Sequence, residues 1–426
     1  TEEYIAEYQT TSTTGLKNIF SKAHLAQKNW AKLKIKKRIS YFKKLVSAIE
    51  KEKIILASLI TEEMGKPITE AVAEIERCTI PLKYYIENGE NLLKNEIVKT
   101  QAEKSYIHFE PIGLVAIFSP WNYPLWGIFR QLAPALLCGD CILIKPHSKV
   151  AGSAKYILKI VKKAGLPAGL VSVVLGDEIE EPLIAGVETV IAITSPYHGR
   201  IIAEIAGRYL KRINLELSGS DPFIVLEDAD VEYVAQRAVT SRLMNSGQDC
   251  VAAKRFVVRK EVYKIFIEQF VEKMKRMRMD NPTDPAINIG PLGDKNLLKI
   301  LKTQIDDAIQ KGAKLILGGD KMKQKGYFFQ PTVLIDARAD MKVWQEETYG
   351  PVAAIMAVKD DAEAVAMAND SPFGLGASIW TKDMNRGNII AEKLEVGIIA
   401  VNEQPKSNPA MPFGGIKKSG IGRELS

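Results

Sequence analysis

The stretch Leu114–Pro124, LVAIFSPWNYP, joins an apolar run to a turn that prolines constrain. The uninterrupted apolar run from Leu114 to Phe118 is typical of a strand buried on both faces of a parallel sheet. Pro120 and Pro124 end the strand and fix the backbone on either side of Asn122. The stretch therefore predicts a strand of an α/β domain with a polar turn at its carboxyl end, where such folds bind ligands.

Further short apolar runs follow, separated by helix-length segments, as in β-α-β units. One intervening segment, 151–164, is a helix candidate that ends at Gly-Leu-Pro. Helical periodicity also covers 14–93, and the runs EIVKTQ and SYIHF after residue 95 predict a hairpin or an exposed edge. The remaining strand candidates are 141–144, 171–175, 189–193 and 213–217. This half predicts an open α/β nucleotide-binding domain.

A second α/β set begins after Ser218, and 426 residues are too many for one small core. Here the pattern favours helices at 231–245 and 262–277, and strands at 255–258, 353–358 and 397–401. We therefore expect two domains that meet at the loops carrying the polar motifs.

Composition narrows the class of protein. Hydrophobic residues make up 46% and charged residues 26%, as in soluble globular proteins. The net charge of +7 is the difference between 58 basic and 51 acidic residues that are mixed along the chain, and this mixing does not favour nucleic-acid binding. The uncharged run 111–129 contains three prolines, which argue against a membrane helix. The acidic, polar start TEEYIAEYQ is not a signal peptide, and the sparse cysteines indicate a reducing compartment, so we expect a cytoplasmic protein.

The pair Cys138 and Cys141 has C-x-x-C spacing, which occurs in redox and zinc sites. The sequence has no second such pair, and none of its four histidines stands at ligand spacing. We interpret both cysteines as packing residues and expect no metal.

Two more predicted strands end in residues that carry chemistry. Lys145, in Lys-Pro-His-Ser, can reach ribose or phosphate oxygens of a nucleotide, although a solvated lysine explains it equally well. Ser148, three residues later, tolerates a 2′-phosphate that a carboxylate would repel, which favours NADP over NAD. Glu216 lies in an apolar run and is either a buried general base or a member of an ion pair.

Cys250 follows Asn-Ser-Gly-Gln-Asp, a turn-prone polar run that suits a thiol presented by a loop. No histidine lies within about 50 residues of it, so backbone amides rather than a neighbouring imidazole could favour its thiolate. Asn122, held between prolines, could donate its amide to a developing oxyanion, or it could simply form a turn.

Six motifs occur in order along the chain: Ser-Pro-Trp-Asn-Tyr-Pro, Lys-Pro-x-Ser, Leu-Glu-Leu-x-Gly-Ser, Asn-x-Gly-Gln-x-Cys, Glu-Glu-x-Tyr-Gly-Pro (346–351) and Pro-Phe-Gly-Gly-Ile-Lys-x-Ser-Gly (412–420). In this order and spacing the chain resembles the aldehyde dehydrogenase superfamily over its whole length, and its pattern is most similar to the succinate-semialdehyde dehydrogenase branch.

The resemblance implies a role for each matching residue. Cys250 matches the nucleophile that forms a thiohemiacetal and then a thioester, Glu216 the base for deacylation, and Asn122 the oxyanion-hole amide. The residues that match the cofactor site are Ser119, Trp121, Lys145, Ser148, Leu217, Glu347 and Tyr349. The implied cofactor is NADP, with NAD as the alternative.

The resemblance also implies the domain plan. It predicts a twisted-sheet cofactor domain (1–95 and 115–217), an α/β catalytic domain (218–418) and a β-hairpin oligomerisation arm (96–114) of a homodimer or homotetramer. The family's tail strand follows the last motif; residues 419–426 form a short segment without it, and we expect that tail to be missing from the chain. The family's Thr-Gly-Ser segment is replaced by Thr-Ser-Pro from residue 194, and Ser218 stands where glycine is usual.

Arg130 matches an arginine that faces the substrate tunnel in succinate-semialdehyde dehydrogenases, and Trp126 is expected beside it. Arg130 could therefore bind a distal carboxylate of the substrate, or it could pair with the protein's own acids. A second arginine of some of those enzymes is replaced by Met244. A small hydroxyaldehyde such as glyceraldehyde or lactaldehyde remains an alternative substrate. Two alternative reactions also remain open: transfer of the acyl group to CoA, and thioesterase-like hydrolysis that uses Cys250 without redox chemistry.

Overall fold

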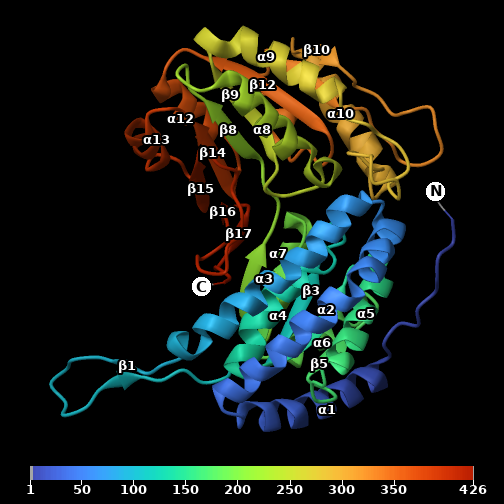
Figure 1. Cartoon of the computed structure of the whole chain (residues 1–426), viewed down its shortest axis with the longest axis vertical. Coiled ribbons are helices and arrows are strands. Elements are labelled where there is room, and N and C mark those ends of the chain that lie inside the picture. Colours follow the sequence, from blue (N-terminus) through green and yellow to red (C-terminus); the bar gives the residue numbers. More distant parts are fainter. Residues whose placement is uncertain (1–2, 426) are drawn as a thin grey trace.

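The computed structural model describes residues 3–425 and contains two lobes, each built on a sheet (Figure 1). The first sheet has the strand order β17-β7-β6-β3-β4-β5 and the second the order β10-β11-β12-β9-β8-β14-β15. Both are mainly parallel, with antiparallel pairs at β17–β7 and β10–β11. The predicted α/β class is confirmed, and the antiparallel pairs make both sheets mixed.

The first sheet contains β3 (Leu114–Ser119), β4 (Cys141–Pro146), β5 (Val171–Val173), β6 (Thr189–Ile193), β7 (Arg212–Glu216) and β17 (Gly420–Ile421). Its helices are α1 (Thr13–Ala31), α2 (Ile35–Met64), α3 (Ile68–Leu92), α4 (Trp126–Cys138), α5 (Ala151–Lys163), α6 (Glu180–Ala185) and α7 (Pro196–Arg208), with the short 3-10 helix η1 (Ser148–Val150). The expected strands all form, within two residues of their predicted ends.

The second sheet contains β8 (Asp221–Val225), β9 (Ala253–Arg259), β10 (Lys314–Leu317), β11 (Thr332–Ile335), β12 (Val352–Val358), β14 (Gly376–Trp380) and β15 (Ile398–Val401). Its helices are α8 (Val231–Leu243), α9 (Lys260–Lys275), α10 (Lys295–Gln310), α11 (Lys342–Gln345), α12 (Asp361–Asn369) and α13 (Met384–Ala391), with the 3-10 segment η2 (Met244–Gly247). The short strands β13 (Phe373–Gly374) and β16 (Ile416–Lys417) form a separate pair.

The chain passes from one sheet to the other between the end of β7 at Glu216 and the start of β8 at Asp221. It then returns: β17, from the segment 419–426, pairs with β7 of the first sheet, Gly420 opposite Glu216. The end of the described chain is therefore part of the first sheet, which the sequence pattern did not predict.

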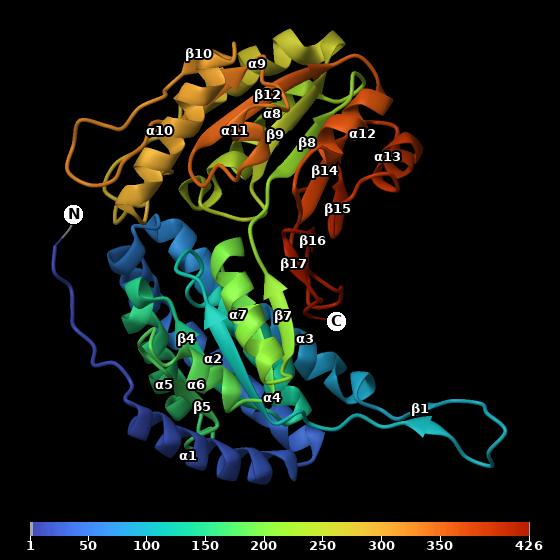
Figure 2. The same cartoon turned by 180° about the vertical axis from the view of Figure 1, so that it is seen from behind.

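A hairpin of β1 (Glu96–Ile97) and β2 (Tyr106–Ile107) projects from the body of the molecule (Figure 2). Its apolar side chains face solvent in the single chain, and Ile97 is 89% exposed. The hairpin lies within the segment 96–114 that the resemblance assigns to an arm.

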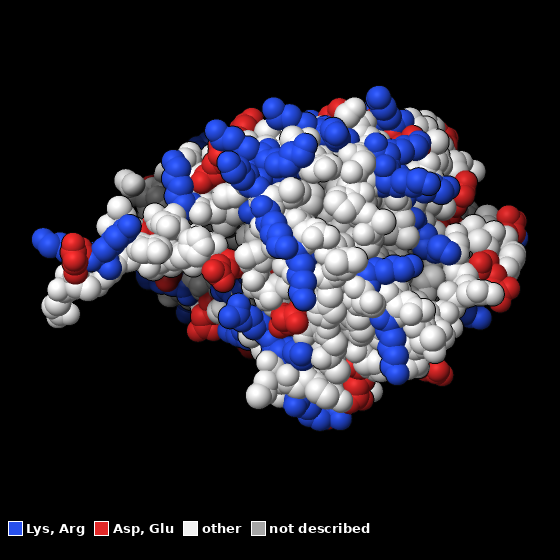
Figure 3. All heavy atoms as spheres, turned by 90° about the horizontal axis from the view of Figure 1, so that it is seen from below, with Lys and Arg blue, Asp and Glu red and all other residues white. Residues whose placement is uncertain are grey.

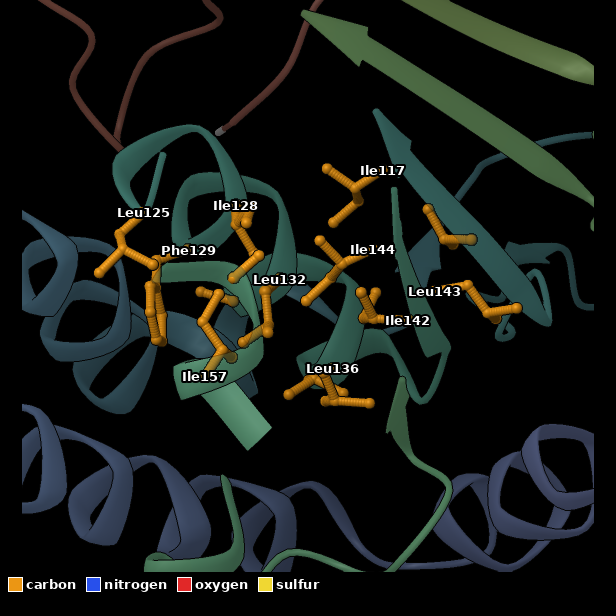
Figure 4. Packing of buried hydrophobic residues seen from close by; sticks show 14 of the residues in the cluster. Ile117, Leu125, Ile128, Phe129, Leu132, Leu136, Ile142, Leu143, Ile144 and Ile157 are labelled. Carbon is orange, nitrogen blue, oxygen red and sulfur yellow. The ribbon is translucent and has the colours of Figure 1, made fainter. Parts of the chain in front are cut away.

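Helix α4 packs on the first sheet because its apolar residues recur every three to four positions. Ile128, Leu132 and Leu136 from this helix lie against Ile117 and Ile144 of the strands (Figure 4). The run 111–129 that is long enough to cross a membrane is thus strand β3, its turn and the first turn of α4. No helix in the described part of the chain is both long and apolar enough to cross a membrane.

The charged surface is mixed in sign. On the face seen from below, Lys and Arg side chains outnumber Asp and Glu but are separated by uncharged surface (Figure 3). Among residues 3–425 no group of three or more His, Cys, Asp or Glu side chains could hold a metal ion.

Truncating a buried leucine of α4 should destabilise the first lobe. Leu136 is fully buried, so Leu136→Ala should lower the free energy of unfolding by about 2–5 kcal/mol through lost burial and a cavity. Leu25 of α1 is 65% exposed, so Leu25→Ala should change the free energy of unfolding by less than about 0.5 kcal/mol. Urea unfolding followed by tryptophan fluorescence measures both; equal effects would contradict the packing described here.

Candidate active site between the two sheets

A cavity of about 710 Å³ lies between the lobes, at the carboxyl ends of β3, β4, β6 and β7. Strand ends on one side and the loop of Cys250 on the other bring together residues from both lobes. Nine residues singled out from the sequence line it: Ser119, Trp121, Asn122, Lys145, Ser148, Leu217, Cys250, Glu347 and Tyr349. Glu216, Trp126 and Arg130 do not belong to this lining, although Glu216 directly precedes Leu217, which does.

The loop before Cys250 has an unusual backbone. Asn245, Ser246 and Gly247 have φ angles of 51°, 57° and 78°, a run of left-handed residues that ends helix α8 sharply. At Gly247 a Cβ would lie 2.3 Å from the carbonyl carbon of Gly350, so only glycine fits. This turn aims the chain at the cavity.

Partners from both lobes hold this strained turn in place. The Asn245 N–H donates to Glu70 Oε2 at 2.7 Å, and the Asn245 side chain donates to the Asn122 carbonyl at 2.9 Å. Ser246 Oγ accepts from the Gly290 N–H at 2.9 Å. The sequence did not indicate Glu70, because its helix gives no sign that it packs against a loop far along the chain.

Cys250 Sγ lies 3.8 Å from Glu216 Oε1. Burial raises the pKa of this thiol well above its ordinary value, and the carboxylates Asp249 and Glu216 raise it further, while Lys254 acts in the opposite direction. The thiol is therefore protonated at neutral pH in this state. A proton acceptor must act before the sulfur can attack, and Glu216 is in reach.

The fully buried Lys254 stabilises the nucleophile loop. Its Nζ donates to the carbonyls of Asp249 and Cys250 at 2.7 and 2.9 Å, and it lies 3.4 Å from Glu347 Oε1. A lysine in the apolar strand after Cys250 is the sequence signal that could have identified it. It fixes the loop backbone and neutralises part of the local negative charge.

The Asn122 amide is held by partners at the cavity. Its Nδ2 donates to the Gln248 carbonyl at 3.0 Å, and its side chain also hydrogen-bonds the Tyr349 hydroxyl. These bonds fix the side chain beside the Cys250 loop. This geometry suits a donor to negative charge that develops near the sulfur.

Arg130 lies in an ion-pair cluster with the protein's own acids. Its guanidinium contacts Glu216 Oε2, and its Nε lies 2.6 Å from Glu424 Oε1. The alternative of an internal ion pair therefore describes Arg130 in this structure. The cause is β17, which carries the end of the chain beside β7 and brings Glu424 to the guanidinium.

Glu424 carries the proton in this cluster. Burial raises the pKa of its carboxyl well above the ordinary value; Arg130 opposes the shift, and the neighbouring Glu216 adds to it. Glu216 and Glu424 thus share the cation Arg130. Trp126, 4% exposed, packs under Arg77, whose guanidinium is 4.3 Å from the ring centroid.

The other end of the cavity fits a dinucleotide. Lys145 Nζ lies 2.9 Å from Asp177 Oδ1, and the Asp177 side chain is 84% exposed and free to move away. Glu347 accepts from the Gly219 N–H at 3.2 Å, and Trp121 and Tyr349 meet edge to face at 5.8 Å. Lys145 and Glu347 offer a cation and a carboxylate that can bind ribose hydroxyls. The rings of Trp121 and Tyr349 offer apolar surface against which a nicotinamide dinucleotide can pack.

Comparisons with known proteins agree with this site. The model of the aldehyde dehydrogenase family matches residues 1–426. The chain is 39% identical to succinate-semialdehyde dehydrogenase [NADP(+)] of Mycobacterium avium over 384 residues, which cover 89% of this chain and 81% of that protein. It is 36% identical to the probable succinate-semialdehyde dehydrogenase [NADP(+)] of Synechocystis over 95% of this chain and 90% of the relative.

A solved structure has the same fold. Succinic semialdehyde dehydrogenase from Streptococcus pyogenes, in complex with NADP+, superimposes with a TM-score of 0.96 at 32% identity and covers 99% of this chain and 94% of that chain. The resemblance that the six motifs carry is thereby confirmed. The chain belongs to the aldehyde dehydrogenase family and is an NAD(P)-dependent aldehyde dehydrogenase.

Proposed function

We propose that this aldehyde dehydrogenase oxidises a small semialdehyde such as succinate semialdehyde to the carboxylate, with NADP+ as cofactor. In this proposal Cys250 is the nucleophile, Glu216 the general base and Asn122 the oxyanion donor. The observation that carries it is the distance of 3.8 Å between Cys250 Sγ and Glu216 Oε1 at a cavity that also holds Lys145 and Glu347.

In the first step Glu216 accepts the proton of the Cys250 thiol, directly or through one water molecule, and the sulfur attacks the aldehyde carbon. The carbonyl oxygen becomes an oxyanion, which the side-chain amide of Asn122 stabilises by exchanging one of its present hydrogen bonds for one to the ligand. Loss of one such donor costs about 3–4 kcal/mol of barrier. The product of this step is a thiohemiacetal on Cys250.

A bound nicotinamide supplies the hydride acceptor that converts the thiohemiacetal to a thioester. The chain's part is to hold the cofactor: Lys145 and Glu347 would bind its two ribose groups, and Ser148 leaves room for a 2′-phosphate. Trp121 and Tyr349 would pack beside it, with Ser119 and Leu217 completing the groove.

After it has released the thiol proton to solvent, Glu216 accepts a proton from a water molecule that attacks the thioester carbonyl, and the Cys250 sulfur leaves as the carboxylic acid forms. Arg130, which contacts Glu216, supports this role by orienting its carboxylate. A base aimed at water favours hydrolysis to the acid over transfer to another acyl acceptor.

The proposed substrate is supported by the names of the relatives and by the position of Arg130. Relatives at 36–39% identity are named succinate-semialdehyde dehydrogenases, and Arg130 is the cation next to the reacting centre that a distal carboxylate could reach by displacing Glu424. The internal ion pair of Arg130 favours a second candidate, a small neutral hydroxyaldehyde, which needs no such displacement.

We further propose that the exposed hairpin 96–114 joins copies of the chain into a homodimer or homotetramer.

Removing the nucleophile should abolish oxidation but leave cofactor binding. Cys250→Ala should lower kcat by more than about a thousandfold, since no other thiol faces Glu216 in the described residues. Cys138→Ala, the control, should retain activity. Absorbance of reduced nicotinamide measures turnover, and an active alanine variant would refute the assignment.

The charge of Asp249 should set the pH at which Cys250 becomes reactive. Because Asp249 raises the pKa of the thiol, Asp249→Asn should lower that pKa and shift the rise of the alkylation rate to lower pH. Iodoacetamide labelling of Cys250 against pH measures it.

The matched control is Tyr123→Phe, which removes the hydrogen bond of 2.7 Å to Asp249 but keeps the charge. This variant should not move the profile to lower pH. If both variants behave alike, the hydrogen bond rather than the charge governs the thiol.

A comparison of succinate semialdehyde with butanal separates the two substrate candidates. If Arg130 binds the distal carboxylate, the wild-type kcat/KM for succinate semialdehyde should exceed that for butanal by at least about tenfold. Arg130→Leu should remove this preference and also slow both substrates, since Glu216 loses its cation. An equal kcat/KM for both aldehydes in the wild type would favour the hydroxyaldehyde.

A further inference from the structure

A carboxylate that the family resemblance did not predict lies in the cofactor cavity. Glu180, the first residue of α6, has Oε1 at 3.2 Å from Lys145 Nζ and Oε2 at 2.8 Å from His198 Nε2. The Glu180 side chain is 13% exposed, and all three residues line the cavity. Three separate elements, β4, α6 and α7, therefore converge on one charged cluster.

Glu180 is held in place, in contrast to the other acid at Lys145. Its partner His198 is itself fixed: Nδ1 lies 3.2 Å from Thr194 Oγ1, and the ring meets Phe118 edge to face. Burial alone would raise the pKa of Glu180, but the hydrogen bond from His198 and the charge of Lys145 together bring it below its ordinary value. Glu180 is thus a fixed negative charge, whereas Asp177 is exposed and can leave.

This charge changes the interpretation of Ser148. The absence of a carboxylate at position 148 indicates tolerance for a 2′-phosphate, yet the fold places a carboxylate from α6 beside the same lysine. A carboxylate accepts a hydrogen bond from a ribose 2′-hydroxyl and repels a 2′-phosphate. Any ligand group that binds Lys145 Nζ comes close to Glu180, because the two are 3.2 Å apart.

We propose that Glu180 is a specificity-determining residue that limits the affinity for NADP+ relative to NAD+, and that His198 reduces this effect by binding the carboxylate. The proposal rests on the proposed function, through the assignment of Lys145 to the ribose that carries the 2′ group. His198 donates from Nε2 to Glu180 and so draws negative charge away from Lys145.

The test is the affinity of the full chain for each dinucleotide without aldehyde, measured by isothermal titration calorimetry. Glu180→Gln keeps the shape and removes the charge, so the ratio Kd(NAD+)/Kd(NADP+) should rise about tenfold. Glu180→Ala should also raise the ratio Kd(NAD+)/Kd(NADP+). This second variant shows whether a new hydrogen bond made by the glutamine contributes to the effect. The control Glu181→Gln, next in sequence but paired with Arg208 outside the cavity, should leave the ratio unchanged.

His198→Gln should lower the ratio, and the double variant with Glu180→Gln should return it to the level of Glu180→Gln alone, because His198 acts through the carboxylate. A ratio that stays within about twofold in both Glu180 variants overturns the proposal. If those variants and the wild type still oxidise aldehydes, the proposed function stands. Failure of the wild type to bind either dinucleotide would instead refute the cofactor assignment of the whole cavity.

Discussion

The left-handed turn Asn245–Gly247 is the constraint on which the site depends. A single left-handed residue other than glycine is already unfavourable, and here two precede Gly247. The backbone adopts this path because the Asn245 N–H is bound by Glu70, its side chain by the Asn122 carbonyl, and Gly350 leaves no room for a side chain at 247. One lobe thus shapes the loop of the other.

The reacting groups lie among buried charges that oppose one another. Burial, together with Asp249 and Glu216, keeps the Cys250 thiol protonated, and Lys254 reduces but does not cancel their effect. Arg130 contacts both Glu216 and Glu424. The result is a neutral thiol with the Glu216 carboxyl group close by as a possible acceptor for its proton.

At the end of the cavity that would hold the cofactor, a buried lysine likewise lies next to groups of opposite charge. Lys145 contacts an exposed carboxylate, Asp177, and a largely buried one, Glu180. In our proposal a ligand displaces the first but must accommodate the second. The choice of cofactor then depends on short segments, the loop before α6, the start of α6 and the first turn of α7, as well as on the strand that supplies the lysine.

By itself the sequence determined most of the strands, most of the helices and the family. Strands such as β3 and β6 were predictable because a short apolar run is a local property, and the motifs around Asn122, Lys145, Glu216, Cys250 and Glu347 carry the family resemblance. Tertiary structure alone decided the partners: β17 beside β7, Glu424 at Arg130, Glu70 at Asn245 and Glu180 at Lys145. A contact between residues far apart in the chain depends on how whole elements pack, and no local pattern of side chains encodes that distance.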